Sequence, residues 1–161
     1  MTIEIATRNA EETRDLGRRL GALCQAGQVI GLHGNLGAGK TVFAQGVGLG
    51  LGVLEPVSSP TFNLAQHYLG AVPLWHLDAY RLASAEDLDD LSWEELLSEP
   101  AVIVVEWAER IAAALPEDRL DVHLAATDAE TRTARLSACG PRSEALLSEL
   151  QEQLHHARTS A

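Results

Sequence analysis

The chain has 161 residues, 46% of them hydrophobic, and this length and composition predict a single globular domain over residues 1–161. We expect a cytoplasmic protein, because no apolar run approaches the roughly 20 residues that cross a membrane and no basic segment followed by an apolar one opens the chain. The formal net charge of −11 repels nucleic-acid phosphates, which argues against tight, independent binding of nucleic acid.

The basic residues are distributed unevenly between the two types. Eleven are arginine and one, Lys40, is lysine. The planar guanidinium group of arginine does not replace a compact ammonium group at sites that need a point charge. We therefore expect Lys40 to occupy such a site.

The first predicted elements are a strand, a helix, a strand and a helix. Alternating apolar residues predict a short strand at 2–6, and Asn9 is expected to open an amphipathic helix that ends at Gly27. The apolar run 29–32 predicts a buried strand. After a glycine-rich loop, residues 40–49 predict a second helix, so the loop has the setting of a phosphate-binding loop.

The middle of the chain predicts two strands, at 62–69 and 72–77, and their short connection favours antiparallel pairing. An acidic helix is expected over 84–97. Its charges indicate a solvated face, with a docking surface anchored by Trp93 as the alternative. The apolar run 101–105 then predicts a strand that is buried on both faces.

The remainder predicts a helix at 107–115, strands at 120–125 and 133–138, and a helix at 143–155. Helices interleaved with strands on either side of one buried sheet make a three-layer α/β domain. We therefore predict the P-loop NTPase fold, with a mixed, mostly parallel central sheet.

The glycine-rich loop carries a specific motif. The segment Gly34–Thr41, GNLGAGKT, matches the pattern G-x-x-x-x-G-K-[ST] at every fixed position. Glycines let main-chain N–H groups approach phosphate oxygens, and the following helix adds its positive N-terminal end. Lys40 is placed to reach the outer phosphates of ATP, and the Thr41 hydroxyl to bind Mg²⁺. The nucleotide-binding residues expected in this loop are Gly34, Asn35, Leu36, Gly37, Ala38, Gly39, Lys40 and Thr41.

Two acids, Asp78 and Glu106, close predicted buried strands. A phosphoryl-transfer site needs carboxylates at strand ends near the phosphate loop, where they hold the metal or orient a water molecule. We predict catalytic roles for Lys40, Asp78 and Glu106. Metal binding is predicted for Thr41, Asp78 and Glu106, with an ordinary polar strand end as the alternative for each acid.

The segment 58–61 is a candidate nucleotide-responsive loop, in which the Thr61 hydroxyl would sense the γ-phosphate. An ordinary surface loop is the alternative. His33, His67 and His76 occur singly, without the spacing of metal ligands on a recognisable element, so we predict no catalytic role for them.

Several motifs in the same order resemble the TsaE (YjeE) family of ATPases, over nearly the whole chain. The matching segments are Gly34–Thr41, Ser59–Phe62 (SPTF), His76–Leu82 (HLDAYRL), Glu106–Trp107 and the strands around Thr131–Arg132. Val42 and Asn63 depart from the family pattern, which often has threonine and a hydroxyl residue at those positions.

The resemblance implies an accessory ATPase that uses ATP and Mg²⁺, docks on the TsaB–TsaD heterodimer and supports threonylcarbamoyladenosine formation on tRNA. It implies contact with tRNA only through that complex. Lys40 and Thr41 would hold phosphates and Mg²⁺, and Asp78 and Glu106 would serve metal and water. The remaining implied nucleotide contacts are Thr61 in the responsive loop, Trp107 beside the site and Arg132 near the nucleotide.

Two other functions use the same loop. A small-molecule kinase would need an arginine-rich lid and an acceptor pocket, and no such lid segment is evident in the sequence. A nucleotide-gated binding module would report ATP to a partner without hydrolysing it, and it would need neither Asp78 nor Glu106 as a catalyst.

Overall fold

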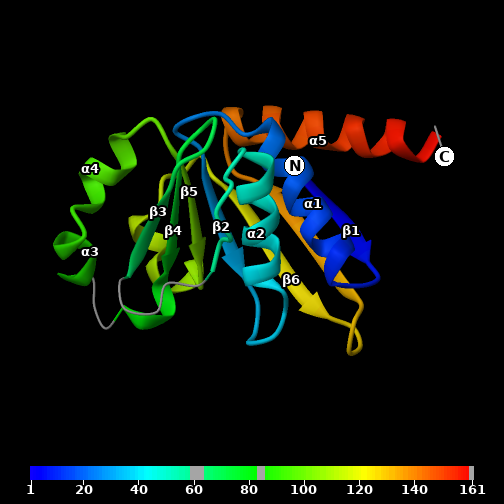
Figure 1. Ribbon diagram of the computed structural model, residues 1–161, viewed down its shortest axis with the longest axis horizontal. Helices are drawn as coiled ribbons and strands as arrows, with labels where there is room; N and C mark the ends of the chain where they lie inside the picture. Colours follow the sequence, from blue (N-terminus) through cyan, green and yellow to red (C-terminus); the bar gives the residue numbers. More distant parts are fainter. Residues whose placement is uncertain (59–63, 83–85, 160–161) are drawn as a thin grey trace.

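The computed structural model of the protein describes residues 1–58, 64–82 and 86–159. The strands span Thr2–Thr7 (β1), Val29–His33 (β2), Ala65–Tyr68 (β3), Leu74–Asp78 (β4), Val102–Glu106 (β5), Leu120–Ala126 (β6) and Arg132–Ala138 (β7). Within the described residues they form one sheet in the order β1-β7-β6-β2-β5-β4-β3 (Figure 1). The central strands β6, β2, β5 and β4 run parallel, and antiparallel pairs β1–β7, β7–β6 and β4–β3 complete the two edges.

Helices cover both faces of this sheet. They span Ala10–Leu23 (α1), Lys40–Gly50 (α2), Glu86–Asp90 (α3), Trp93–Ser98 (α4) and Pro141–Thr159 (α5), with 3₁₀ segments at Ala79–Arg81 (η1) and Ala108–Ala114 (η2). Apolar residues of α1, α2 and α5 pack on one face, and those of α3, α4 and η2 pack on the other. The predicted three-layer α/β fold with a mixed sheet, parallel at its centre, is confirmed.

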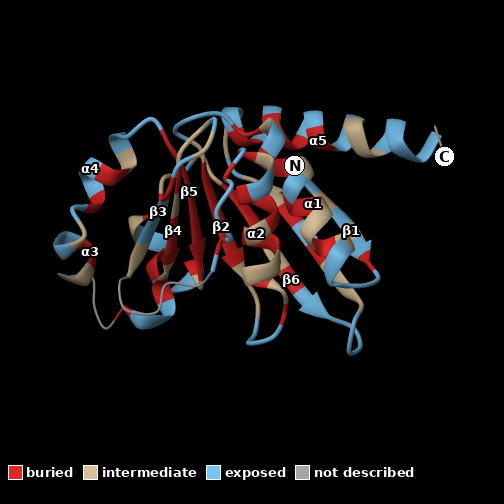
Figure 2. Cartoon of the chain, viewed as in Figure 1, coloured by how far each residue is buried: buried red, intermediate tan, exposed pale blue. Residues whose placement is uncertain are grey.

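Strand β5 shows how the sequence builds two cores. All five of its residues are buried, and Figure 2 shows the central strands as the most continuously buried part of the sheet. Val102 and Val104 join the apolar cluster that includes α2, whereas Ile103 and Val105 join the cluster on the opposite face. Because side chains alternate along a strand, Glu106 points to the same face as Val104, toward α2.

Glycines bring α1 and α2 into main-chain contact. A Cβ atom placed on Gly46 would lie 2.0 Å from the Arg14 carbonyl oxygen, and one placed on Gly21 would lie 2.3 Å from the Val47 carbonyl oxygen. Neither position has room for a side chain. The helix that follows the glycine-rich loop therefore lies directly against the main chain of α1.

Three helix predictions require correction. The first helix ends at Leu23 rather than Gly27. The acidic helix predicted over 84–97 is two short helices, because Ser92 adopts a left-handed conformation with φ of 54°. The helix predicted at 107–115 is a 3₁₀ segment with non-helical geometry at Ile111.

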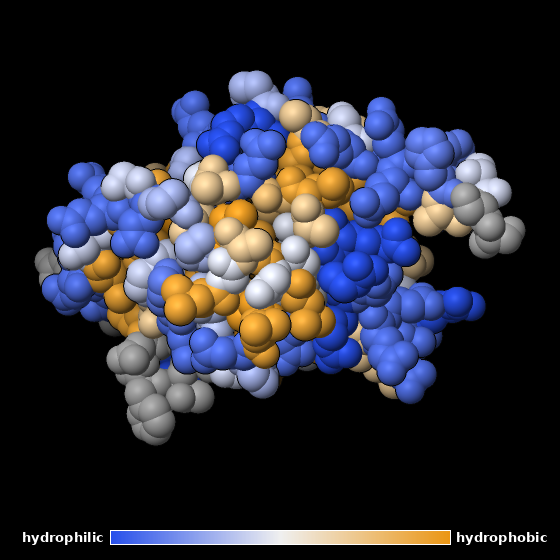
Figure 3. All heavy atoms as spheres, turned by 45° about the horizontal axis from the view of Figure 1, so that its top comes forward, coloured by the Kyte–Doolittle hydropathy of each residue, from blue (hydrophilic) through white to orange (hydrophobic). Residues whose placement is uncertain are grey.

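Trp93 is not an exposed docking anchor. Its side chain is buried, and its indole N–H donates to the Ala114 carbonyl oxygen over 3.0 Å. Exposed leucines lie elsewhere in the described residues, at Leu36, Leu49, Leu54 and Leu69. Figure 3 shows hydrophobic side chains gathered over the middle of the face it presents, with hydrophilic ones around them.

No helix in the described part of the chain is both long enough and apolar enough to span a membrane.

Candidate functional site

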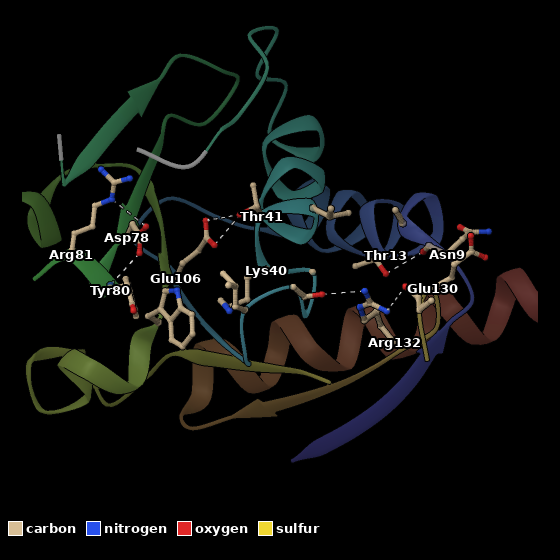
Figure 4. Close-up of a pocket in the computed structure, with 17 residues that line it drawn as sticks. Asn9, Thr13, Lys40, Thr41, Asp78, Tyr80, Arg81, Glu106, Glu130 and Arg132 are labelled. Atoms are coloured by element: carbon tan, nitrogen blue, oxygen red, sulfur yellow. Dashed lines mark hydrogen bonds and ion pairs between the residues drawn. The ribbon is translucent and has the colours of Figure 1, made fainter. Parts of the chain in front are cut away.

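A cavity of about 760 Å³ lies beside the loop between β2 and α2. On one side its walls come from the segments at the ends of β4 and β5, and on the other from the start of α1 and the β6–β7 hairpin (Figure 4). Lys40 and Thr41 lie between these walls. The lining residues outside the loop include Asn9, Thr13, Asp78, Tyr80, Arg81, Glu106, Trp107, Glu130 and Arg132.

The loop owes its shape to its glycines. Gly37 and Gly39 have φ of 81° and 104°, a conformation that side chains disfavour. A Cβ atom on Gly34 would lie 2.4 Å from the Leu124 carbonyl oxygen, so the loop packs tightly against β6 at its start. Within the loop, Ala38 is buried. The loop residues that line the cavity are Leu36, Gly37, Gly39, Lys40 and Thr41.

Lys40 lies at the start of α2 with 5% of its surface exposed. Its ammonium group donates to the carbonyl oxygens of Gly34 and Asn35, and it lies 3.9 Å from the centre of the Trp107 ring. Burial lowers the pKa of Lys40, and nearby carboxylates, Glu106 foremost, offset this effect in part. A bound anion would favour the charged form of the lysine further.

Glu106 connects the loop to the neighbouring strand. The Thr41 hydroxyl donates to Glu106 Oε1 over 3.1 Å, and His76 Nε2 lies 2.6 Å from Glu106 Oε2. Strands β4 and β5 place Asp78 directly beside Glu106 in register. Two carboxyl groups and one hydroxyl group thus converge at the strand ends that border the cavity.

Glu106 carries its negative charge although only 4% of its surface is exposed. Burial alone would raise the pKa of this carboxyl group. That effect is outweighed by the hydrogen bond and charge of His76, the hydrogen bond from Thr41 and the charge of Lys40. The pKa of Glu106 therefore lies below its ordinary value. At neutral pH the group is a carboxylate, the form that binds a metal ion or accepts a proton.

Asp78 has a structural role at the cavity edge as well. Its Oδ1 atom accepts a hydrogen bond from the Tyr80 main-chain N–H over 3.1 Å and so caps η1. Arg81 Nε lies 3.7 Å from Asp78 Oδ2. The Asp78 side chain is largely buried, and besides capping η1 it lines the cavity.

Arg132 reaches the loop from the opposite wall. Its Nη2 atom donates to the Gly37 carbonyl oxygen over 3.1 Å, and Nη1 donates to the carbonyl oxygens of Asp128 and Thr131. The guanidinium group is thus fixed beside the phosphate loop. Of the predicted nucleotide contacts, Trp107 and Arg132 both line the cavity. Thr61 lies outside the described residues.

Some site residues carried no sequence signal for their location. Asn9 is recognisable as a helix cap, and its side chain does accept from the Glu12 N–H, but nothing local places it at a cavity. The sequence shows His76 as an isolated histidine, whereas the structure places it in contact with Glu106. Strand alternation could have found it, because His76 and Asp78 are two residues apart and point to the same face.

A glycine-rich GxxxxGKT loop between a parallel strand and a helix, at the carboxyl edge of the sheet, defines a protein of the P-loop class. The profile of one family, described as "Threonylcarbamoyl adenosine biosynthesis protein TsaE", matches residues 7–134. The chain belongs to the TsaE family.

Individual relatives agree with this assignment. A protein of Treponema pallidum named "tRNA threonylcarbamoyladenosine biosynthesis protein TsaE" is 44% identical over 118 residues, which cover 73% of this chain and 87% of that protein. The Bacillus subtilis protein of the same name is 38% identical over 145 residues, 89% of this chain and 90% of its own. The crystal structure of Bacillus subtilis YdiB superposes with a TM-score of 0.78 at 34% identity and covers 95% of this chain and 96% of that one.

Proposed function

We propose that this protein binds Mg-ATP in the cavity and hydrolyses it as an accessory ATPase of tRNA threonylcarbamoyladenosine formation, acting with the TsaB–TsaD heterodimer in the cytoplasm. Membership of the TsaE family supports the pathway. The observation that carries the nucleotide part is the hydrogen bond from Thr41 to Glu106. It joins a phosphate-loop hydroxyl to a buried carboxylate at a strand end, which is the pairing that metal-assisted phosphoryl transfer requires.

The residues present fit ATP and Mg²⁺. The glycine main chain and Lys40 form a cradle for phosphates, because the loop bears no side chains that would block their approach at Gly37 and Gly39. Thr41, Asp78 and Glu106 offer the oxygen ligands that Mg²⁺ prefers. When bound, Mg²⁺ neutralises the charge that develops on the phosphates. Among the described residues, no three or more His, Cys, Asp or Glu side chains gather as a metal site, so the proposal relies on a hydroxyl group, phosphate oxygens and water as further ligands.

Trp107 and Arg132 are proposed to flank the nucleotide. Both line the cavity, and both are held by contacts with the loop or its lysine. Asp78 and Glu106 share the metal and water roles in this proposal. The protein would contact tRNA only through the complex. Its net charge of −11 supports this, because a negative protein repels the phosphates of tRNA.

The first test measures ATP hydrolysis by the purified chain, alone and with TsaB–TsaD, together with threonylcarbamoylation of tRNA over several turnovers. The proposal predicts repeated turnover only when this protein and hydrolysable ATP are both present. Transfer of phosphate to a small acceptor would instead identify a kinase. If TsaB–TsaD does not change ATP hydrolysis by this protein, and this protein does not change tRNA modification, TsaB–TsaD is not its partner.

The second test separates hydrolysis from nucleotide-gated binding. Glu106→Gln keeps the shape of the side chain and removes its charge, so ATP hydrolysis should fall by about a hundredfold or more while ATP still binds. Glu94→Gln, at an exposed position of α4, is the matched control and should leave turnover unchanged. ATP binding without measurable turnover in the wild type would favour the gated binding module, and equal turnover in wild type and Glu106→Gln would remove the catalytic role of Glu106.

A further inference from the structure

His76 joins two parts of the molecule from a fully buried position on β4. None of its surface is exposed. On one side of the ring, Nδ1 lies 3.2 Å from the Ser58 carbonyl oxygen, and on the other, Nε2 lies 2.6 Å from Glu106 Oε2. A carbonyl oxygen and a carboxylate oxygen only accept, so Nδ1 donates in the first of these contacts and Nε2 donates in the second.

The contact with Glu106 is specific to one oxygen of its carboxylate. His76 contacts Oε2 alone, whereas the Thr41 hydroxyl lies 3.1 Å from Oε1 and 3.4 Å from Oε2. The two contacts together determine the rotation of the carboxylate about its terminal bond. Without the imidazole, Oε2 would be left in the core with one fewer partner, and rotation would be less restricted.

The other nitrogen of His76 fixes the main chain of Ser58. The Tyr68 hydroxyl oxygen also lies within 3.2 Å of the Ser58 N–H and accepts from it. Ser58 is therefore held by two side chains from neighbouring strands, β3 and β4. A residue that only filled space in the core would need neither nitrogen, and leucine or phenylalanine would serve.

We propose that His76 is a positioning residue: it orients the Glu106 carboxylate so that Oε1 faces Thr41 and the cavity. The inference rests on the proposed Mg-ATP function, because the orientation matters where a metal ion shares these oxygens. Residues that orient a metal-binding side chain through a hydrogen bond commonly affect metal affinity without touching the metal.

Three substitutions of His76 distinguish the role of Nε2 from the role of Nδ1. His76→Gln places an amide N–H₂ near the position of Nε2 and can keep the contact with Glu106. His76→Asn places its amide group near Nδ1 and can keep only the contact with Ser58. His76→Leu keeps neither. Tyr68→Phe, which removes a contact with Ser58 and leaves Glu106 untouched, is the matched control.

The readout is the affinity for a non-hydrolysable ATP analogue, measured by calorimetry with Mg²⁺ and again with EDTA. Wild type, His76→Gln and Tyr68→Phe are expected to show the same gain in affinity from Mg²⁺. His76→Asn and His76→Leu should lose about tenfold or more of that gain, with the affinity in EDTA unchanged within about twofold. In a Glu106→Gln background, His76→Leu should have no further effect.

Several outcomes would overturn the inference. A full Mg²⁺ effect in His76→Leu, or rescue by asparagine in place of glutamine, would show that the contact with Glu106 is not what matters. If His76→Leu does not fold, the comparison of glutamine with asparagine decides. Absence of any Mg²⁺ effect in the wild type would overturn the proposed function itself, and this inference with it.

Discussion

The ammonium group of Lys40 lies over the ring of Trp107, 3.9 Å from its centre. The same group donates to two loop carbonyl oxygens. Among the described residues, no carboxylate forms an ion pair with it. The lysine is thus held directly by dipoles and an aromatic face, and a phosphate group would bring an opposite charge into direct contact with its ammonium group.

Nucleotide binding should therefore alter the fluorescence of Trp107, because phosphates compete with its ring for the ammonium group. We expect the change on titration with ATP to persist in Trp75→Phe, whose indole N–H donates to Glu99 away from the cavity. It should vanish in Trp107→Phe. A change that survives in Trp107→Phe would mean that another tryptophan reports binding.

Lys40→Arg should lower the affinity for ATP by about tenfold or more, since a charge-assisted hydrogen bond contributes roughly 1.5–3 kcal/mol. The larger, planar guanidinium group does not fit between the loop carbonyls and Trp107 as an ammonium group does. Calorimetric titration of the folded variant would measure the loss. Arg135→Lys, at an exposed position of β7, is the control for a change between the two basic side chains. Equal affinity of Lys40→Arg and wild type would contradict the assigned role.

Gly46→Ala should destabilise the protein, although alanine ordinarily favours a helix by about 1 kcal/mol over glycine. The added methyl group would meet the main chain of α1 at Arg14 and Arg18. Overpacking of this kind typically costs about 1–3 kcal/mol. Urea unfolding would measure the loss, with Leu49→Ala at a half-exposed position of the same helix as the control. A stabilised Gly46→Ala variant would show that the helices separate easily.

Asp121→Asn should reduce stability at neutral pH by roughly 1–3 kcal/mol, because it weakens buried hydrogen bonds to charged groups. Asp121 lies 2.8 Å from His33 Nε2 and accepts from Arg119 Nε. Burial raises the pKa of Asp121, but His33 and Arg119 outweigh it, and the net shift is downward.

A carboxyl group whose pKa is lowered in the folded state stabilises the fold at pH values above its pKa in the unfolded state, which is about 3.9 for aspartate. That contribution is lost as the pH falls through the lower value of the folded state. The difference in unfolding free energy between wild type and Asp121→Asn should therefore shrink as the pH falls below about 4. Asp90→Asn, at an exposed site of α3, should show no such dependence.

The sequence predicts those parts of the structure that depend on local patterns. Continuous apolar runs identified β2 and β5, and the position of Glu106 at the end of β5 followed from the run before it. Asn9 was recognisable as a helix cap from its residue type and setting. The loop motif likewise placed Lys40 and Thr41 together at the start of α2, because their spacing is local.

What the sequence could not place depends on contacts between distant segments. Arg132 comes to the phosphate loop because β7 turns back on β6, and no pattern near Arg132 encodes that meeting. The contact between His76 and Glu106 depends on the pairing of β4 with β5. The break at Ser92 also escaped prediction, since a left-handed serine is an uncommon conformation that no neighbouring glycine or proline announces.

The main-chain contact between α1 and α2 limits how the cavity can change shape. With Gly46 set against Arg14, α2 cannot tilt toward α1 without a collision of backbones. We therefore expect the phosphate loop, α2 and α1 to keep their relative positions. We expect any rearrangement that accompanies nucleotide exchange to occur at the opposite wall, in the segments that follow β4 and β5, where side chains rather than backbones form the contacts.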